Sequence, residues 1–344
     1  MQPTNDQWTS LYDMAATFKK QGSWEWLSNG HLFGIEHPDT KEIGYISILG
    51  QGGEAFGLSL YLGTRGLSVL MDMLNGDVDE DPLFTQHCLL MALNDREDLH
   101  PEERRKIKEL GLTFRGKNAW PAFLYYEPGY VPSSQLTAEQ VEYLTLALQQ
   151  GMQLAEEYRT KADELLHDDP TKILVRVRRS DASDGQAAVW ENEWRSLPVQ
   201  TEAVPDETMG IRVDELHLAR LKKGELSREA VWEIDCTYIP VPLMEGERAI
   251  FPKLLLLVDQ ASGQILKAGI SSREIIAQEA VDGFLEAIDK QQVIPSRIEA
   301  LTEEAYMYIG PILQYLEIEA YLAMELPALE EAKDNMMMGL TAGR

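Results

Sequence analysis

The sequence contains little cysteine and no recognisable set of zinc ligands. Its 344 residues include two cysteines, Cys88 and Cys236, which lie far apart and outside any C-x-x-C pair. The six histidines show no metal-ligand spacing either. A disulfide framework needs several spaced cysteines, and a structural zinc site needs about four Cys or His ligands. The composition therefore predicts a protein that is neither disulfide-stabilised nor secreted, and that has no zinc site.

Long apolar runs are also missing. A membrane-spanning helix needs about 20 predominantly apolar residues, whereas the apolar runs here, such as residues 254–258, are far shorter. The first residues, Met-Gln-Pro-Thr-Asn-Asp, have neither the basic nor the apolar segment of a signal peptide. We therefore expect a cytoplasmic protein that does not contact a membrane.

Positive charge is scarce relative to negative charge. The chain has 57 Asp and Glu against 31 Lys and Arg, which gives a formal net charge of −26. Because proteins bind phosphate backbones through Lys and Arg, this balance disfavours nucleic acid as a partner. It equally disfavours anionic membranes. The partner that this composition favours is another protein, of unknown identity.

What the sequence does contain is enough apolar residue for two cores. Hydrophobic residues make up 44% of the chain, and its length predicts two domains. The apolar spacing in residues 1–200 predicts an α+β domain. Its expected elements are a helix at 6–19, strands at 31–36, 43–49 and 55–61, helices at 66–74, 101–110 and 137–166, a strand at 122–126, and a hairpin of strands at 172–179 and 187–194; residues 85–93 are ambiguous. Residues 199–209 are polar and contain proline, so we interpret them as a linker.

Residues 208–340 form the second predicted domain. The pattern predicts strands at 231–240, 253–259, 264–270, 297–301 and 318–323, with helices after the third, fourth and fifth. Because side chains alternate along a strand, Glu233 and Asp235 share one face of the first strand, and Trp232, Ile234 and Cys236 share the other. The order is β-β-β-α-β-α-β-α.

Two short runs in this second domain resemble a known family. Trp-Glu-Ile-Asp-Cys-Thr at residues 232–237 and Val-Asp-Gln-Ala-Ser-Gly at residues 258–263 resemble the catalytic core of retroviral integrases and related transposases. The resemblance covers residues ~231–338. It implies an α/β ribonuclease H-like fold with a mixed five-stranded sheet, in which the strand of Asp235 lies between the strands at 253–259 and 296–301.

The N-terminal domain carries a separate resemblance. Gly-Tyr-Ile-Ser-Ile-Leu-Gly at residues 44–50 and Phe-Gly-Leu-Ser-Leu-Tyr-Leu-Gly at residues 56–63 are similar to a module of uncharacterised bacterial two-domain proteins. These motifs are structural glycines and apolar strands. The resemblance therefore implies a two-domain organisation and a bacterial origin, and it implies no activity.

Enzymes of the ribonuclease H-like fold hold two Mg²⁺ ions about 3.5–4 Å apart with about three acids from separate elements. By resemblance, Asp235 is the first acid and Glu303 occupies the position of the second. Glu330, Glu331 and Asp334 are the candidates for the third, on the final helix. Asp235, Glu303 and Asp334 are the candidate metal ligands, and Mg²⁺ or Mn²⁺ is the cation that such carboxylates would take.

The sequence departs from the family at this site. Glu303 stands where a shorter aspartate is expected, Ala305 replaces the glycine of the turn, and residues 231–344 carry 19 acidic against 8 basic side chains. We therefore predict a non-catalytic interaction or regulatory module on a degenerate ribonuclease H-like fold. In that case Asp235 is a hydrogen-bonded core acid, and Glu303 is an acid that favours a helix N-terminus. The alternative is a divalent-metal-dependent nuclease or phosphoryl-transfer enzyme that uses the carboxylate cluster.

Other motifs have simpler interpretations. Residues 50–55 fit G-x-G-x-x-A, but a strand follows them where the dinucleotide motif requires a helix, so they predict a hairpin turn. Residues 77–81 mimic the start of a calcium loop without its glycine, and predict an acidic surface loop. His87 and Cys88 lack a catalytic partner. The tryptophans at spacings of two or four residues are core or rim residues, with a ligand-binding face as the alternative: Trp24, Trp26, Trp190 and Trp194.

Overall fold

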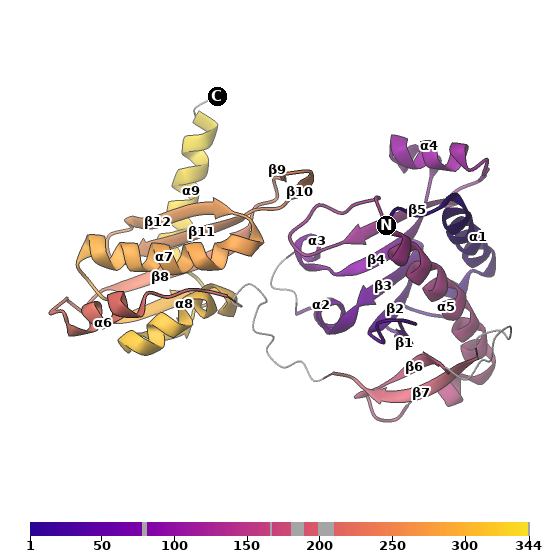
Figure 1. Cartoon of the computed structure of the whole chain (residues 1–344), viewed down its shortest axis with the longest axis horizontal. Helices are drawn as coiled ribbons and strands as arrows, with labels where there is room; N and C mark the ends of the chain where they lie inside the picture. Colours follow the sequence, from indigo (N-terminus) through magenta and orange to yellow (C-terminus); the bar gives the residue numbers. More distant parts are fainter. Residues whose placement is uncertain (78–80, 166, 180–188, 199–209, 343–344) are drawn as a thin grey trace. The chain divides into compact units, whose positions relative to one another are not determined.

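The structure is a computed structural model that describes residues 1–77, 81–165, 167–179, 189–198 and 210–342. The chain divides into two units, each with its own sheet (Figure 1). Unit 1 comprises Met1–Pro128 and Pro132–Gln200, and unit 2 comprises Gly129–Val131 and Thr201–Arg344. Both units combine helices with strands, so the chain is α+β. The predicted linker at 199–209 and most of the predicted acidic loop at 77–81 lie outside the described residues.

Unit 1 is built on a seven-stranded mixed sheet in the order β5-β4-β3-β2-β1-β6-β7. Its strands are β1 (Phe33–Glu36), β2 (Ile43–Leu49), β3 (Gly57–Leu62), β4 (Cys88–Asn94), β5 (Trp120–Tyr126), β6 (Lys172–Arg178) and β7 (Trp190–Ser196). All neighbouring strands are antiparallel except β1 and β6, which are parallel. The predicted hairpin of β6 and β7 is confirmed, and the ambiguous segment at 85–93 supplies β4.

Helices cover both faces of this sheet (Figure 1). They are α1 (Asn5–Gln21), α2 (Gly63–Asn75), α3 (Pro82–Thr85), α4 (Pro101–Glu109) and α5 (Ala138–Leu165), with short 3-10 turns η1 (Ser23–Glu25) and η2 (Arg96–Asp98). Side-chain alternation sends Leu58 and Leu60 of β3 into the core beneath α1 and α5, and Tyr61 into the core beneath α2. Unit 1 is therefore a three-layer arrangement with a core on each side of the sheet.

The long helix α5 begins at a defined cap. Thr137 Oγ1 accepts a hydrogen bond from the Gln140 amide at 3.2 Å, and Gln140 Oε1 accepts one from the Thr137 amide at 2.8 Å. This reciprocal pair satisfies two N–H groups that have no partner inside the helix. It fixes the first turn of α5, and with it the helical face that is directed at β6 and β7.

Unit 2 contains a five-stranded mixed sheet in the order β12-β11-β8-β13-β14. Its strands are β8 (Val231–Tyr238), β11 (Lys253–Asp259), β12 (Ile265–Ser271), β13 (Arg297–Ala300) and β14 (Glu319–Leu322). The central strand β8 is antiparallel to β11 and parallel to β13. The predicted position of the Asp235 strand between these two neighbours is confirmed. A separate hairpin of β9 (Leu243–Glu245) and β10 (Arg248–Ile250) was not predicted from the sequence pattern.

The helices of unit 2 pack on both faces of its sheet. They are α6 (Glu215–Lys223), α7 (Arg273–Gln291), α8 (Glu303–Leu316) and α9 (Pro327–Ala342). Leu255 and Leu257 of β11 belong to the core with α7 and α8, whereas Leu256 and Val258 pack against α9 around Leu329. A strand that is buried on both faces reads as a continuous apolar run, which explains residues 254–258.

No helix in the described part of the chain combines the length and apolar character that crossing a bilayer requires.

Candidate functional site

An ion pair joins the central strand of unit 2 to its last helix. Asp235 is fully buried on the face of β8 that is directed at α9. Its Oδ2 accepts a hydrogen bond from Lys333 Nζ, and the same ammonium lies 3.4 Å from Thr237 Oγ1. Lys333 belongs to α9, and its side chain retains 28% exposure. The charge of the buried acid is thus balanced by a partly exposed lysine.

The second oxygen of Asp235 is less well satisfied. Asp235 Oδ1 is buried and has no hydrogen-bond partner among the described residues. A buried carboxylate is stable only when it is paired and hydrogen-bonded, because water no longer solvates its charge. Lys333 therefore provides most of the compensation that keeps Asp235 inside the sheet.

Glu233, two residues before Asp235, accepts a hydrogen bond from a backbone amide at the start of α9. Its Oε2 accepts a hydrogen bond from the Leu329 amide at 2.8 Å, in the first turn of α9. Its Oε1 accepts one from Gln260 Nε2 at 3.1 Å, and that nitrogen also donates to Glu299 Oε2 at 2.8 Å. The first N–H groups of a helix have no intrahelical partner and carry partial positive charge, so a carboxylate there is favourable. Glu233 thus acts as a cap supplied from the sheet.

A second buried cation lies on the neighbouring strand. Lys253 of β11 is buried, and its Nζ lies 2.6 Å from each carboxylate oxygen of Glu304 on α8. Tyr308 donates its hydroxyl to Glu304 Oε1, and Lys253 Nζ lies 4.3 Å from the Tyr238 ring centroid. Burial, together with the adjacent Glu304 carboxylate, raises the pKa of Tyr308 well above its ordinary value. Tyr308 therefore stays protonated and remains a donor.

The carboxylates singled out from the sequence are distributed differently. Asp235 is buried, but Glu303 is the exposed first residue of α8. Glu330, Glu331 and Asp334 are exposed on α9. Across the described residues, no group of three or more His, Cys, Asp or Glu side chains is arranged so that it could hold a metal ion.

The surroundings of Asp235 do not fit a divalent cation in this arrangement. Mg²⁺ needs several oxygen ligands in near-octahedral geometry, including at least one or two carboxylates. Next to Asp235, however, the closest charged group is the ammonium of Lys333. A divalent cation on Oδ2 would have to displace that ammonium or be repelled by it. The positive charge that balances Asp235 is supplied by the protein itself.

Sequence reasoning missed Lys333, although the helical repeat contains a signal for it. Lys333 lies four residues after the buried Leu329, so both residues occupy the same face of α9. Glu330, Glu331 and Asp334 flank that face in sequence. Gln260 and Glu304 were also missed, because each meets its partner only through tertiary packing.

The remaining motifs have structural roles. The Gly53 amide donates to Gly50 O at 3.0 Å between β2 and β3, so the predicted hairpin turn at residues 50–55 is confirmed. Burial raises the pKa of the Cys88 thiol well above its ordinary value, which keeps it protonated. His87 Nε2 lies 3.3 Å from the Tyr125 hydroxyl.

The tryptophans divide between core and pocket. Trp24 packs against Phe56 with ring centroids 5.3 Å apart, and Trp26 Nε1 donates to Ala155 O at 2.9 Å. Trp194 packs on His167, with ring centroids 4.9 Å apart. Trp190, in contrast, lines a pocket of unit 1. Of these four tryptophans, Trp190 lines this pocket, whereas Trp194 is exposed outside its lining.

Comparisons with known proteins give families without an assigned activity. Among curated proteins, no significant match to this chain is found. Among solved structures, a chain of the simian T-cell lymphotropic virus intasome, determined by cryo-electron microscopy in complex with PP2A regulatory subunit B56 gamma, aligns with a TM-score of 0.26 and 20% identity. That alignment covers 36% of this chain and 45% of the other, so this chain spans less than half of the length of the intasome chain.

Two family models match separate stretches of the sequence. Residues 8–176 match a domain of unknown function (DUF7309), and residues 217–337 match a second domain of unknown function (DUF6930). The first stretch lies in unit 1, apart from Gly129–Val131, which belong to unit 2. The second stretch lies in unit 2. The chain is thus similar, in two consecutive parts, to two families whose descriptions assign no activity.

Proposed function

We propose that the protein is a non-catalytic interaction or regulatory module, and that unit 2 is a degenerate ribonuclease H-like domain. The observation that carries this proposal is the pairing of Asp235 with Lys333. In an active domain of that fold, the central-strand acid holds a metal ion together with acids from other elements. A lysine in contact with this acid replaces the charge of the metal and removes its catalytic chemistry.

The strand order supports the fold assignment. The first three long strands of unit 2, β8, β11 and β12, pair antiparallel in sequence order. The next two, β13 and β14, add in parallel on the other side of β8. This is the arrangement that the resemblance to integrase cores implies, with the acid-bearing strand in the centre. A fold alone does not define an activity, so the functional part of the proposal rests on the site.

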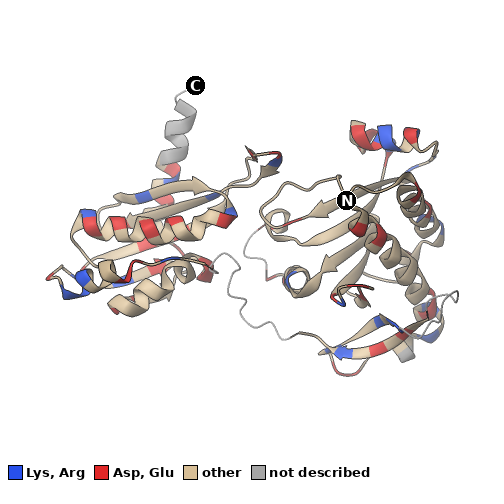
Figure 2. Cartoon of the chain, viewed as in Figure 1, with Lys and Arg blue, Asp and Glu red and all other residues tan. Residues whose placement is uncertain are grey.

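The charge of unit 2 supports the same conclusion. Acidic side chains are distributed along α7 and at the start of α8, as Figure 2 shows for unit 2. Residues 231–344 contain 19 acidic and 8 basic side chains. Each phosphate contact requires a basic group that releases counterions, so this region is poorly suited to a nucleic acid substrate. A protein partner remains the better match.

The proposal predicts that the purified chain does not cleave DNA or RNA in the presence of Mg²⁺ or Mn²⁺. The physical reason is that Lys333 neutralises Asp235 and that Glu303 and Asp334 are exposed elsewhere. The measurement is a gel assay with single- and double-stranded substrates, run on the wild type, Asp235→Asn and Lys333→Ala. Cleavage by the wild type that disappears in Asp235→Asn would contradict the proposal and establish the metal-dependent nuclease.

A charge reversal at Lys333 tests whether its ammonium occupies the place of a metal ion. Lys333→Glu would place a second carboxylate next to buried Asp235 in place of the ammonium, and two adjacent carboxylates repel each other. We expect this variant to melt well below the wild type in EDTA and to recover with millimolar Mn²⁺, because oxygen ligands would then be available.

Thermal melting with and without Mn²⁺ makes the comparison, with Lys333→Gln as the matched control. The glutamine variant loses the ammonium without adding a carboxylate, so Mn²⁺ should leave its melting temperature unchanged. An equal Mn²⁺ effect on the wild type, Lys333→Gln and Lys333→Glu would show that cations bind elsewhere, and would remove this support.

A further inference from the structure

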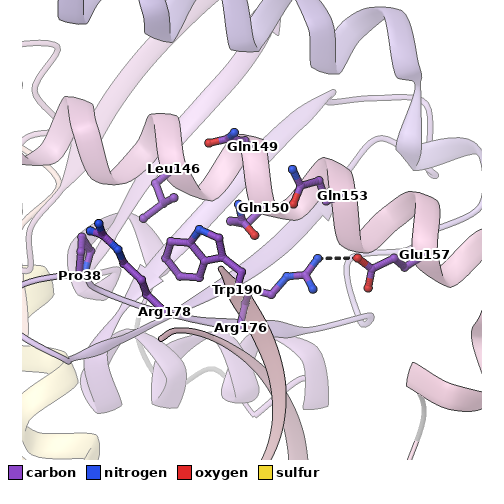
Figure 3. A pocket seen from close by; sticks show the side chains of 9 residues that line it. All are labelled: Pro38, Leu146, Gln149, Gln150, Gln153, Glu157, Arg176, Arg178 and Trp190. Atoms are coloured by element: carbon purple, nitrogen blue, oxygen red, sulfur yellow. Dashed lines mark hydrogen bonds and ion pairs between the residues drawn. The ribbon is translucent and has the colours of Figure 1, made fainter. Parts of the chain in front are cut away.

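Unit 1 contains a pocket between helix α5 and the β6–β7 hairpin (Figure 3). The described residues that line it belong to unit 1, and none of them belongs to unit 2. Its volume is about 650 Å³. Small-molecule sites commonly have volumes of about 300–1,000 Å³ and few, well-placed polar groups. The side chains that matter here are Gln150, Gln153 and Glu157 from α5, Arg176 and Arg178 from β6, and Trp190 from β7.

The face of α5 over this pocket is unusually polar. Leu146, Gln150, Gln153 and Glu157 recur at steps of three or four residues, so they occupy one side of the helix, toward the hairpin. A helix that covers a sheet normally buries apolar residues on that side. Gln150 is only 2% exposed, and its Oε1 has no hydrogen-bond partner among the described residues. A buried amide oxygen without a donor is unfavourable, and a ligand donor would satisfy it.

Arg176 offers the complementary unsatisfied group. It is 6% exposed, and it donates through Nη2 to Glu157 Oε1 at 2.7 Å and through Nη1 to Asn192 Oδ1 at 2.9 Å. These two bonds fix the guanidinium plane, which Figure 3 shows directed along the pocket toward Glu157. The Nε group is buried and has no partner in the described part of the chain. Among the described residues, the pocket lining thus has one acceptor and one donor without a hydrogen-bond partner, and the donor belongs to a guanidinium that two hydrogen bonds hold in place.

Arg178 and Trp190 complete the site. They are directly paired across β6 and β7, and because side chains alternate along a strand they lie on the same side of the hairpin as Arg176 and its partner Asn192. Arg178 is exposed, and no ion pair of this side chain occurs among the described residues. The two arginines outnumber the single acid Glu157, so the pocket has an excess of positive charge in a chain of net charge −26.

We propose that this pocket binds a small organic anion in which a phosphate or carboxylate is attached to a flat, hydrogen-bonding ring. Arg178 supplies the charged fork for the anionic group, a geometry that guanidinium matches in two parallel hydrogen bonds. The Trp190 indole supplies a surface for stacking, a contact that suits a planar ring. Gln150 Oε1 and Arg176 Nε then accept from and donate to the polar edge of that ring.

Two sources share this chemistry, namely nucleoside monophosphates and aromatic carboxylates, and calorimetry with the full chain distinguishes them. The probes are the four ribonucleoside 5′-monophosphates, indole-3-acetate, adenosine and inorganic phosphate. We expect saturable binding of a nucleotide or of the aromatic carboxylate, and weaker binding of adenosine and of inorganic phosphate, each of which offers half of the chemistry. If none of the five complete probes binds, or if inorganic phosphate binds as tightly as they do, the proposal is wrong.

Variants assign the binding to this pocket. Arg178→Gln removes an exposed charge without breaking an ion pair described in the structure, and it should weaken binding about tenfold or more, since hydrogen bonds to charged groups contribute strongly. Arg105→Gln on α4 is the matched control, because Arg105 is exposed and lies outside the pocket lining. Equal affinity of the two variants would overturn the assignment.

Gln150→Leu separates a ligand role from a structural one. Because Gln150 Oε1 has no partner among the described residues, its replacement by an apolar side chain should leave the melting temperature unchanged or raise it. The same change should abolish ligand binding. A variant that melts lower but binds the probe as well as the wild type would show that Gln150 has a structural role, and would overturn the proposal.

Discussion

Replacing Lys333 by methionine is expected to lower the free energy of unfolding of unit 2 by about 3 kcal/mol. Methionine keeps most of the aliphatic stem of lysine, so the change removes the ammonium with little loss of packing. Asp235 would then remain buried with neither oxygen paired to a cation. The expected loss lies at the low end for a broken buried pair, because the 28% exposure of Lys333 lets some water approach.

Lys290→Met provides the matched control for this prediction. Lys290 pairs with Glu286 at 2.8 Å on α7, but its side chain is 63% exposed, and exposed pairs contribute at most about 1 kcal/mol. Amide hydrogen exchange in β8 and β11 measures the stability of unit 2 directly. The double variant Asp235→Leu with Lys333→Met should recover much of the loss, since it removes both buried charges. Similar losses for Lys333→Met and Lys290→Met would show that the Asp235 pair contributes no more than a surface pair.

The second large effect is expected at Lys253, where replacement by methionine should lower the free energy of unfolding by about 3–5 kcal/mol. Lys253 is buried, and its ammonium lies 2.6 Å from both carboxylate oxygens of Glu304. After the substitution, the partner left to Glu304 among the described residues would be the hydroxyl of Tyr308. One neutral donor does not compensate a partly buried carboxylate for the loss of a cation.

Lys267→Met is the matched control, because Lys267 lies on β12, the strand next to β11 in the same sheet. Lys267 of β12 pairs with Glu286 at 3.2 Å, and both side chains are substantially exposed. Chemical denaturation of the two variants, followed by hydrogen exchange in β11, should give a loss for Lys253→Met several times that for Lys267→Met. The double variant Lys253→Met with Glu304→Gln tests whether the two residues act as a pair. We expect it to lose about as much free energy of unfolding as Glu304→Gln alone. A loss equal to the sum of the two single losses would contradict this coupling.

The strands of unit 2 could be predicted because their signals are local. The alternation around Asp235 assigned Glu233 and Asp235 to one face of β8, and Trp232 and Ile234 to the other. That division needs only the two-residue repeat of a strand. The longer elements of unit 1 followed equally from spacing and turns, apart from β4, and the short helix α3 was not predicted. Residues 88–93 of β4 are all apolar, so the sequence alone does not show which periodicity the segment has. In the structure Leu89, Met91 and Leu93 are buried in one core, whereas Leu90 and Ala92 are only partly buried.

The partners of the buried acids could not be predicted in the same way. Asp235 was identified as unusual because a lone acid in an apolar strand needs compensation, but the sequence offered several compensating groups. The resemblance to integrase cores directed attention to the acids of the last helix, whereas Lys333 of that helix makes the contact. Most of the pocket of unit 1 could not be predicted either. A ligand-binding face was an open alternative for Trp190, but Gln150 and Arg176 lie in different elements and carry no motif.

The parallel pairing of β1 with β6 has a consequence for the order in which unit 1 assembles. Strands β1 to β5 follow one another as antiparallel neighbours, but Gly34 of β1 pairs with Val175 of β6, across nearly the whole of unit 1. Closing so long a loop costs more chain entropy than forming adjacent hairpins, so we expect β6 and β7 to dock last. Until they do, β1 is an open sheet edge during synthesis, with unpaired backbone groups that favour aggregation.

The pocket is formed by the same late step, because its arginines and Trp190 arrive with that hairpin. A ligand held there would bind the completed sheet and not its precursor, and would slow the detachment of the hairpin that unfolding requires. Occupancy of the pocket would then extend the lifetime of the folded chain in the cell.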